Sequence, residues 1–454
     1  MADCALQGRY RVAHTSSLTH MQKPAGHLAR RERLQMEFAA SDGAIGLRKP
    51  TSNLFRHRNS SEKRRVDVRE FNHVLSIDRE RRVAEVEGMT TYEILVNETL
   101  KYGLLPAVVP QLKTITVGGA VSGLGIESSS FRYGLVHETV ESMDVLLADG
   151  RIVSCSCNVN PNLFFGFPNS YGTLGYAIRL TIRLIPAKPF VRLAHLRFSD
   201  PRTYFAHIQS ACERGALDYL DGTIFAKDEM YATQATLCQL SPRLSDYTFM
   251  NVYYQSIREK SEDWMTAKDY IWRWDTDWFW CSRHFGVQNP AIRWLAKPWL
   301  NSRSYQRVMR LSQKHLRDNG TKESVIQDVD IPIDNAVQFF EFLLAEIPIT
   351  PIWVCPFITS DRTWDLCPLP PGKLYINFGF WDVVSSVGEP GYYNRKIENK
   401  AREFGGAKGL YSSSYYDQDT FWSIYNRQHY EELKSVYDPR HQFPDLYEKC
   451  VKNR

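Results

Sequence analysis

Alternating apolar and polar positions predict a set of antiparallel strands in the first part of the chain. Residues 74–87 hold two alternating runs on either side of four charged residues, as a β-hairpin does. A second hairpin is predicted over residues 142–155, where Asp-Gly forms the turn. Residues 177–185 also alternate, which predicts a strand with one buried face and with Arg179 and Arg183 on its exposed face.

Helix signals stand between these strands. Thr90 followed by Glu93 forms a capping box, and the helix that it starts is expected to end at Gly103. The chain then returns as a strand over residues 104–110, and residues 28–38 are predicted to form a short charged helix. Helices mixed with antiparallel hairpins predict the α+β class.

Charge and pattern divide the chain into three parts. Residues 1–43 form a basic preamble, and residues 1–70 as a whole hold 14 Lys and Arg against 7 Asp and Glu. Residues 44–187 contain the predicted hairpins. Two prolines at the end of this part and a change of pattern mark the start of a second domain, residues 188–454.

Composition narrows the class of protein. The chain has 454 residues, of which 43% are hydrophobic and 24% charged, so a disordered chain is excluded and a large core is expected. A net charge of +5 is too small at this length to predict nucleic-acid binding. The 24 Tyr, 23 Phe and 11 Trp favour a pocket for a flat or apolar ligand, because aromatic side chains line such pockets.

The sequence predicts neither a membrane-spanning segment nor a secretory signal, since it has no run of ~20 apolar residues and no apolar stretch at its start. Its nine cysteines are scattered, which predicts a reduced, cytoplasmic protein. Cys155 and Cys157 face the same way on a predicted strand, and no histidine or second cysteine pair lies near them. We therefore expect no metal site.

A glycine-rich segment is the strongest signal for a ligand. Gly118, Gly119, Gly123 and Gly125 lie within residues 110–130, among small and hydroxyl side chains. Glycine permits close backbone approach, and free N–H groups in such a loop can hold a pyrophosphate. The segment matches neither a Walker loop nor a Rossmann turn. A glycine-rich bend packed under a helix is the alternative.

Two further segments favour the ligand interpretation. Residues 167–177 carry Gly172 and Gly175 about fifty residues after the first loop, and two such loops can clamp one extended dinucleotide. A third segment offers hydroxyl, amide and cationic donors to phosphate, namely Thr51, Ser52 and Asn53 behind Arg48 and Lys49.

These segments resemble the FAD-binding domain of the vanillyl-alcohol-oxidase and p-cresol-methylhydroxylase (PCMH) superfamily, and more closely the Diminuto/Dwarf family of delta-24-sterol reductases. The resemblance runs from about residue 44 to the end of the chain. It is carried by residues 116–130, 132–135, 147–150, 172–175, 182–188, 351–357, 374–376 and 419–422. The fold that it implies is a PCMH-type FAD-binding domain of two subdomains and an α+β cap or substrate domain, whose C-terminal segment returns to the flavin.

The resemblance also implies which residues hold FAD. Those expected along the pyrophosphate and the ring are Thr116, Gly118, Gly119, Ser122, Gly125 and Ile126. Those expected at the adenosine or at the edge of the flavin are Gly172, Thr173, Gly175 and Ala177. Many members of the superfamily attach FAD to a histidine in or near the first loop. This loop has none, so non-covalent FAD is predicted.

Tyr411 is the first candidate for chemistry. It matches a tyrosine that the related decaprenylphosphoryl-ribose oxidases place at the flavin, where it would bind substrate or relay a proton. The lysine of that family falls on Ser414, so its chemistry is not transferred whole, and a buried structural tyrosine is the alternative. Tyr375, on a predicted cap strand, and Glu127, the carboxylate of the glycine-rich segment, are weaker candidates.

Residues 264–299 carry seven of the 11 tryptophans. Three interpretations stay open. The segment forms an ordinary core of the cap domain, the entrance to a lipid-sized cavity, or a peripheral membrane contact, since Trp and Tyr favour bilayer interfaces.

The function that the resemblance implies is that of an FAD-dependent oxidoreductase, which moves a hydride between flavin N5 and a carbon of a hydrophobic, sterol- or lipid-like substrate. One version reduces an alkene with NADPH, as delta-24-sterol reductases do. The other oxidises an alcohol, such as a lipid-linked sugar. A flavin-binding protein without activity is a lesser alternative, and the oligomeric state is left open.

Overall fold

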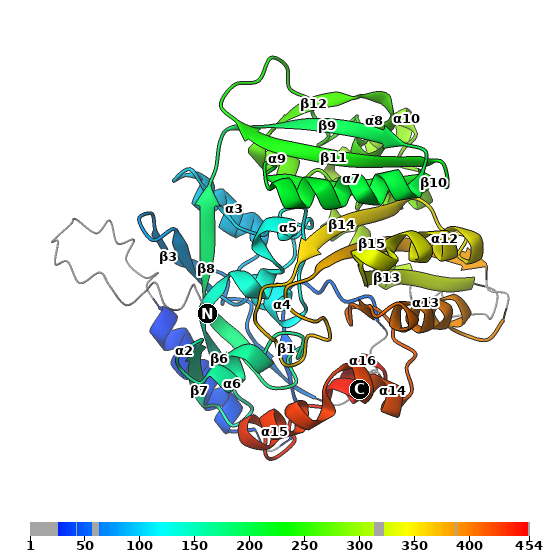
Figure 1. The fold of residues 1–454 in the computed structure, drawn as a ribbon. Helices are drawn as coiled ribbons and strands as arrows, with labels where there is room; N and C mark the ends of the chain where they lie inside the picture. Colours follow the sequence, from blue (N-terminus) through cyan, green and yellow to red (C-terminus); the bar gives the residue numbers. More distant parts are fainter. Residues whose placement is uncertain (1–25, 42, 57–62, 313–321, 386–387, 453–454) are drawn as a thin grey trace.

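Two antiparallel sheets organise the protein (Figure 1). The first sheet is built from strands between residues 74 and 186, and the second from strands between residues 190 and 408. Helices accompany both sheets, which confirms the predicted α+β class. The computed structural model describes residues 26–41, 43–56, 63–312, 322–385 and 388–452.

The first sheet is centred on β8 (Tyr176–Pro186). Its other strands are β3 (Val74–Asp78), β4 (Val83–Glu87), β5 (Leu104–Pro106), β6 (Val140–Leu146) and β7 (Ile152–Ser156). Both predicted hairpins, β3–β4 and β6–β7, are confirmed. Arg183 is exposed as expected, but the prediction is wrong for Arg179. Its guanidinium is half-buried because it pairs with Asp144 at 2.8 Å and with Glu85 at 2.9 Å.

The capping prediction is displaced by one residue. Helix α3 (Tyr92–Leu100) is capped by Thr91, whose side chain accepts a hydrogen bond from the N–H of Ile94. Thr90 is buried instead, and its hydroxyl donates to the carbonyl of His73 at 3.0 Å. The strand expected over residues 104–110 is also shorter, because only β5 pairs with β8.

The predicted charged helix is confirmed as α2 (His27–Ala39), and it packs on the first domain. Leu34 and Phe38 are buried against Leu146 of β6. Next along the chain, β1 (Ile45–Arg48) and β2 (Arg64–Asp67) form a small parallel sheet.

The second sheet has eight strands. In spatial order they are β12 (Glu262–Thr266), β9 (Phe190–Phe198), β11 (Glu229–Cys238), β10 (Tyr219–Ala226), β14 (Ile352–Ile358), β15 (Leu374–Ser385), β13 (Lys322–Pro332) and β16 (Ala407–Lys408). Helices α7 (Pro201–Arg214), α12 (Ala336–Glu346) and α13 (Tyr392–Glu403) cover one face (Figure 1). The other face carries α8 (Tyr253–Glu259) and shares an apolar core with the first domain.

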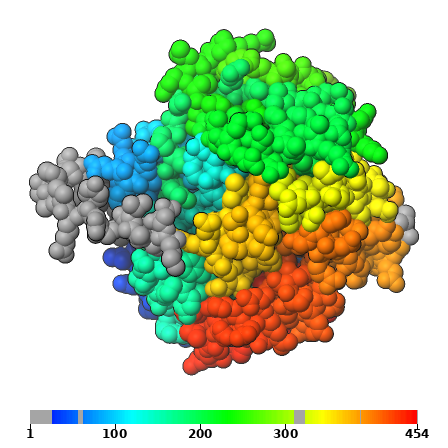
Figure 2. Space-filling view, viewed as in Figure 1, coloured from blue at the N-terminus to red at the C-terminus, as the bar shows by residue number. Residues whose placement is uncertain are grey.

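The C-terminal helices return to the first domain, where the red segment of Figure 2 lies against the teal one. They are α14 (Gln418–Ile424), α15 (Arg427–Tyr437) and α16 (Leu446–Cys450). The ammonium of Lys434 donates to the carbonyl of Thr173 at 2.7 Å, and that of Lys449 donates to the carbonyl of Gly172 at 3.1 Å. None of the helices in the described ranges combines the length and the apolar character that crossing a bilayer demands.

Candidate active site

The glycine-rich segment folds into helix α4 (Val117–Ser122), which Thr116 caps by accepting the N–H of Gly119. A Cβ added to Gly118 would lie 2.8 Å from the carbonyl oxygen of Gly88, so this glycine allows α4 to pack on the first sheet. Gly119 is exposed, and a Cβ there would meet only the Thr116 hydroxyl, at 2.8 Å. Gly119 is therefore the glycine of this pair whose backbone faces outward.

The chain beyond α4 is shaped by packing. Gly125 donates its N–H to Ala120 and accepts from Val136, both at 2.8 Å. A Cβ on Gly125 would approach Val136, Ala120 and Pro110 at 3.0–3.1 Å. Ile126 follows as a half-buried side chain between two apolar clusters.

The second predicted loop lies directly beside the first. Tyr171 donates its N–H to the carbonyl of Ser122 at 3.1 Å. Gly172 and Gly175 both take positive φ, of 74° and 154°. A Cβ on Gly175 would lie 2.6 Å from the Val145 side chain. The structure thus brings the two segments together, while the carbonyls of the second are already bound by the C-terminal lysines.

The third predicted segment lies along the approach to α4. Thr51 donates its hydroxyl to the carbonyl of Thr114 at 3.2 Å, and Asn53 accepts from the Thr114 hydroxyl at 3.2 Å. Asn53 also accepts from the amide of Gln306 in the second domain. These side chains connect the segment to residues 113–116, and their role toward phosphate stays a prediction.

A small cavity of about 40 Å³ lies between the two domains. The first domain contributes Gly123, Leu124 and Ile126 to its lining. The second domain contributes Asp328, Asp330, Asn377, Lys408 and Tyr411. The sequence analysis named Ile126 and Tyr411 as site residues but missed the polar residues Asp328, Asp330, Asn377 and Lys408.

Asp328 and Asp330 are two residues apart on β13, so their side chains point to the same face of the sheet. Asn377 on β15 pairs with Asp330 in register and donates its side-chain amide to it at 2.8 Å. Asp328 stands opposite Gly379, where a Cβ would lie 2.6 Å from its Oδ1. Glycine at that position leaves room for the carboxyl group.

Both aspartates face the cavity and not bulk water. The pKa of each is raised to about 7; burial is the main cause for both, and for Asp328 the charge of Asp330 contributes. Oδ1 of Asp328 and Oδ1 of Asn377 have no hydrogen-bond partner among the described residues. Two enclosed acceptors therefore remain available to a ligand at this site.

Tyr411 connects the aspartates to an aromatic cluster. Its hydroxyl accepts a hydrogen bond from the indole N–H of Trp381 at 3.1 Å and interacts with the Asp328 carboxyl group. Burial is the main cause that raises the pKa of Tyr411 well above its ordinary value. Phe279 stacks on Trp381 at 4.2 Å between ring centroids, and Phe55 meets Tyr411 edge to face at 5.8 Å.

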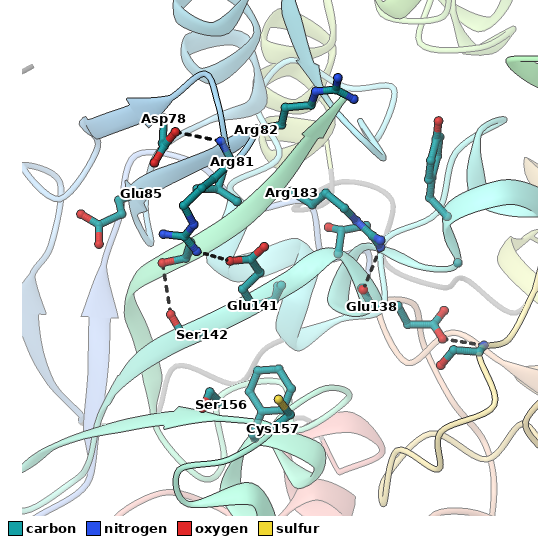
Figure 3. A pocket seen from close by; sticks show the side chains of 18 of the residues that line it. Asp78, Arg81, Arg82, Glu85, Glu138, Glu141, Ser142, Ser156, Cys157 and Arg183 are labelled. Atoms are coloured by element: carbon teal, nitrogen blue, oxygen red, sulfur yellow. Dashed lines mark hydrogen bonds and ion pairs between the residues drawn. The ribbon is translucent and has the colours of Figure 1, made fainter. Parts of the chain in front are cut away.

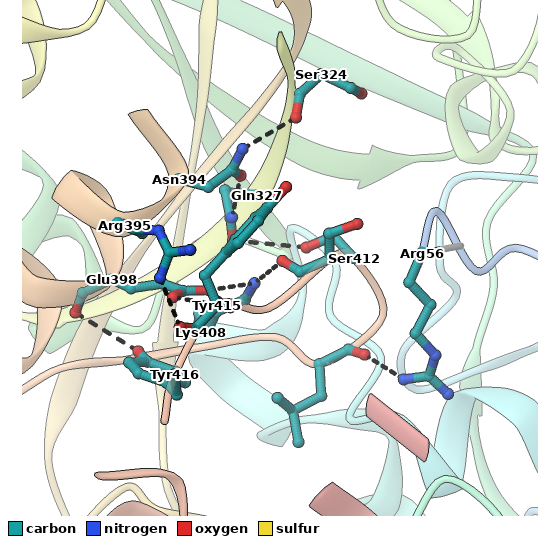
Figure 4. A network of polar contacts seen from close by, with 12 residues as sticks. Arg56, Ser324, Gln327, Asn394, Arg395, Glu398, Lys408, Ser412, Tyr415 and Tyr416 are labelled. Carbon is teal, nitrogen blue, oxygen red and sulfur yellow. Dashed lines mark hydrogen bonds and ion pairs between the residues drawn. The ribbon is translucent and has the colours of Figure 1, made fainter. Parts of the chain in front are cut away.

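Lys408 lines the same cavity, but its ammonium is engaged behind it (Figure 4). It pairs with Glu398 at 3.1 Å and donates to the carbonyl of Ser413. Glu398 also accepts the backbone N–H of Tyr415 at 3.1 Å. This network holds the segment that carries Tyr411 and leaves the two aspartates without a cationic partner among the described residues.

The two weaker candidates lie outside the cavity lining. Tyr375 stacks on Phe357 with ring centroids 5.5 Å apart, and its hydroxyl donates to the carbonyl of Pro370. Glu127 is buried, and Arg273 of the second domain donates to it at 3.0 Å. Their catalytic roles stay predictions; the contacts of Glu127 are those of a tie between domains.

A much larger cavity, of about 1810 Å³, lies elsewhere, along β3, β4, β6 and β8 (Figure 3). None of the predicted site residues lines it. Several of its charged groups have partners on the protein: Arg81 pairs with Glu141 at 2.9 Å, and Arg183 donates to the carbonyl of Glu138. We place the chemistry at the small cavity, because it lies between the domains, includes Tyr411 in its lining and brings together two acceptors without partners, Oδ1 of Asp328 and Oδ1 of Asn377.

A flavin needs exposed backbone near its phosphates and polar groups near its ring. The exposed Gly119 of α4 offers the first, and the polar residues that line the small cavity offer the second. The volume of the cavity fits a flavin less well than its residues do. A cavity of about 40 Å³ is far below the ~300–1,000 Å³ of pockets that hold small molecules, so a ring system requires its two sides to separate.

Comparison with known proteins supports a flavin-binding domain in the first part of the chain. A family model described as an FAD binding domain matches residues 50–156, which include the glycine-rich segment. The chain is 27% identical to the Delta(24)-sterol reductase of Homo sapiens over 406 residues, covering 84% of this chain and 76% of the relative. Identity to the Arabidopsis thaliana Delta(24)-sterol reductase is 25% over 474 residues, covering 93% and 83%. Cytokinin dehydrogenase 10 of Oryza sativa subsp. japonica is 30% identical over 156 residues, covering 34% of this chain and 28% of the relative.

The chain is therefore an FAD-dependent oxidoreductase with a PCMH-type FAD-binding domain. Over most of its length it is similar to proteins named Delta(24)-sterol reductase, which confirms the resemblance drawn from its motifs.

Proposed function

We propose that this oxidoreductase reduces a carbon–carbon double bond of a hydrophobic, sterol-like substrate, with FAD bound non-covalently and NADPH as the electron donor. The observation that carries the proposal is the pair Asp328 and Asp330, which keep a proton near neutral pH at the cavity. Reduction of an alkene adds a hydride to one carbon and a proton to the other. The reaction therefore needs a proton donor at the site.

Bound FAD supplies the hydride chemistry in such a reaction. The Asp328 carboxyl group holds the proton that the second carbon receives. The Tyr411 hydroxyl, which lies between this carboxyl group and Trp381, orients the substrate or passes the proton on. Asp328 then takes up a proton from water, so the pair returns to its starting state.

The apolar surroundings of the site favour a hydrophobic substrate. Trp381 donates to the hydroxyl of Tyr411, Phe279 stacks on Trp381, and Phe55 packs edge to face on the Tyr411 ring. Aromatic surfaces of this kind bind flat apolar molecules and exclude water, which strengthens polar interactions at the reacting atoms.

Non-covalent binding is supported by the place of the nearest histidine in the sequence. His137 is buried edge-on against Trp364, with 4.5 Å between ring centroids, and it does not line the cavity. Acid precipitation of the purified holoprotein should release all of its flavin. Yellow colour that stays in the pellet would contradict this part of the proposal.

Anaerobic mixing with NADPH tests the direction of the reaction. We expect the flavin bands near ~370 and ~450 nm to bleach, and to return when a sterol with a Δ24 double bond is added in the absence of oxygen. Bleaching by an alcohol substrate, with no response to NADPH, would instead support the alcohol oxidase or dehydrogenase that the sequence leaves open.

A further inference from the structure

The Trp-rich segment divides into a buried part and an exposed part. Trp272, Trp274, Trp278 and Trp280 are buried in the core that the two domains share. Helix α10 (Pro290–Leu295) and the turn after it carry apolar side chains on the surface. Their exposed fractions are 47% for Ile292, 66% for Trp294, 67% for Leu295 and 63% for Trp299. We call these four residues the α10 patch.

The α10 patch is rigidly attached to the core. Arg293, between two of its members, is buried and pairs with Asp277 at 2.7 and 2.8 Å. The side chain of Asn289 caps α10 by accepting the N–H groups of Ala291 and Ile292. Four large apolar side chains within eight positions are thus displayed on an anchored helix, where monomeric proteins seldom expose contiguous apolar surface.

The charged residues of the chain around the patch are all basic, although Arg283, Arg293 and Arg303 pair with Asp382, Asp277 and Glu93 of other segments. From residue 278 to residue 317 the sequence contains eight Lys and Arg and not one Asp or Glu. Lys297 lies within the patch, and α11 (Ser302–Ser312) follows with Arg303 and Arg307 on its exposed side. An acid-free basic stretch beside exposed indoles is complementary to a surface that is anionic outside and apolar just beneath.

We propose that the α10 patch docks this protein on anionic lipid bilayers, with Trp294, Leu295 and Trp299 inserted at the interface and Lys297, Arg303 and Arg307 facing the headgroups. Indole rings prefer the level of the headgroups, and basic side chains next to them are attracted to anionic lipids. The proposal goes beyond the proposed function and does not depend on it.

The buried part of the same Trp-rich segment reaches the neighbourhood of the candidate active site. Phe279 stacks on Trp381, which donates to Tyr411. One segment therefore contributes both the exposed patch and an aromatic side chain near Tyr411.

Co-sedimentation of the holoprotein with vesicles tests the proposal. We expect the holoprotein to bind vesicles of phosphatidylcholine that contain roughly 30% phosphatidylglycerol. It should bind little to pure phosphatidylcholine, and the bound fraction should decrease steeply from low to high salt. The double variant W294S/W299S should lose about tenfold or more in binding, and K297E/R307E should lose the preference for anionic lipid. The matched control V159S/V436S removes two exposed apolar side chains outside the patch, one from the first domain and one from α15, and should bind as the parent does.

Flavin content and melting temperature should be measured for every variant. Both are expected to match the parent, because the substituted side chains lie at the surface. Unchanged vesicle binding in W294S/W299S would overturn the proposal and assign any binding to the basic N-terminal region. Absence of binding at low salt would also overturn it. A dimer in light scattering that W294S/W299S abolishes, without vesicle binding, would show that the patch joins two copies of the chain instead.

Discussion

Two pairs of carboxyl groups lie inside the molecule where its domains meet, and they differ in what stands beside them. Glu127 and Asp221 share Arg273, which donates to them at 3.0 and 2.7 Å. Asp328 and Asp330 have an amide and a phenol as neighbours, and no cation hydrogen-bonds to either among the described residues.

This difference indicates a structural role for the first pair and a chemical role for the second. A fixed guanidinium offsets the charge of the first pair and ties the FAD-binding domain to the second sheet. Burial raises the pKa of Glu127 even beside Arg273, which acts to lower it. Asp328 and Asp330 have no such cation, and the pKa of each is raised to about 7, so each carboxyl group can keep a proton near neutral pH and give it up. Enclosed acids without a cation are typical of functional sites.

The largest effect is expected from removing the cation of the first pair. Arg273→Met leaves two buried carboxylates unpaired, and we expect unfolding in urea to show a loss of about 3–5 kcal/mol. The matched triple variant R273M/E127Q/D221N, which removes the charges together, should recover most of this loss. A change below about 1 kcal/mol in R273M would mean that Arg273 does not stabilise the junction.

Removing one acid of the second pair should slow the reaction with the alkene without lowering the stability of the protein. Asp328→Asn is expected to slow reoxidation of reduced flavin by the alkene by ~10²–10⁴-fold, because the proton donor is lost. Flavin reduction by NADPH should stay as in the parent, and the melting temperature near neutral pH should not fall, because Asn removes the cost of ionising a buried carboxyl group. Stopped-flow measurement of both half-reactions checks this, with Asp330→Asn as the matched variant. Equal slowing of both half-reactions in D328N would instead indicate a disturbed flavin site.

Tyr411→Phe sharpens the division further, since it removes only a hydroxyl. If this hydroxyl relays the proton, the alkene half-reaction should slow by ~10²-fold at unchanged flavin content. If it serves only the indole of Trp381, stability should fall by ~1–3 kcal/mol and the rate per bound FAD should not change. Melting temperature and rate, measured on one sample, distinguish the two results.

The smallest effect is a pH dependence of stability. The pKa of Asp328 and of Asp330 is raised from 3.8 to about 7 in the folded protein, so the folded state binds more protons than the unfolded chain between these values. Stability relative to the variant D328N/D330N should therefore decrease as pH rises from about 4 to 7. The decrease should reach at least about 1.4 kcal/mol, the equivalent of one pKa unit. A difference that is flat with pH would contradict the raised values.

Local pattern predicted the strands well because alternation reports burial directly. Both hairpins and β8 follow it, whereas the helix cap moved from Thr90 to Thr91, since either threonine satisfies the local rule and only the tertiary contact with His73 decides. Tyr411 was found from its surrounding motif. Asp328 and Asp330 were missed, because acidic residues that alternate with apolar ones on a strand normally face solvent.

Arg273 was missed for a related reason. In the sequence it is a cation between two tryptophans, and its two carboxylate partners lie 146 and 52 residues away. Pairings over such separations depend on how the sheets meet, which no local period encodes.

The lysines of α15 and α16 have a consequence for how the protein is made. Lys434 reaches the carbonyl of Thr173 across 261 residues of sequence, and Lys449 reaches Gly172. At ~5–20 residues per second, a ribosome produces the partner lysine about 13–52 s after the loop itself. The loop beside the predicted adenosine end of the cofactor is therefore completed only at the close of translation. FAD loading is consequently expected to follow synthesis of the C-terminal helices and not to accompany folding of the nascent first domain.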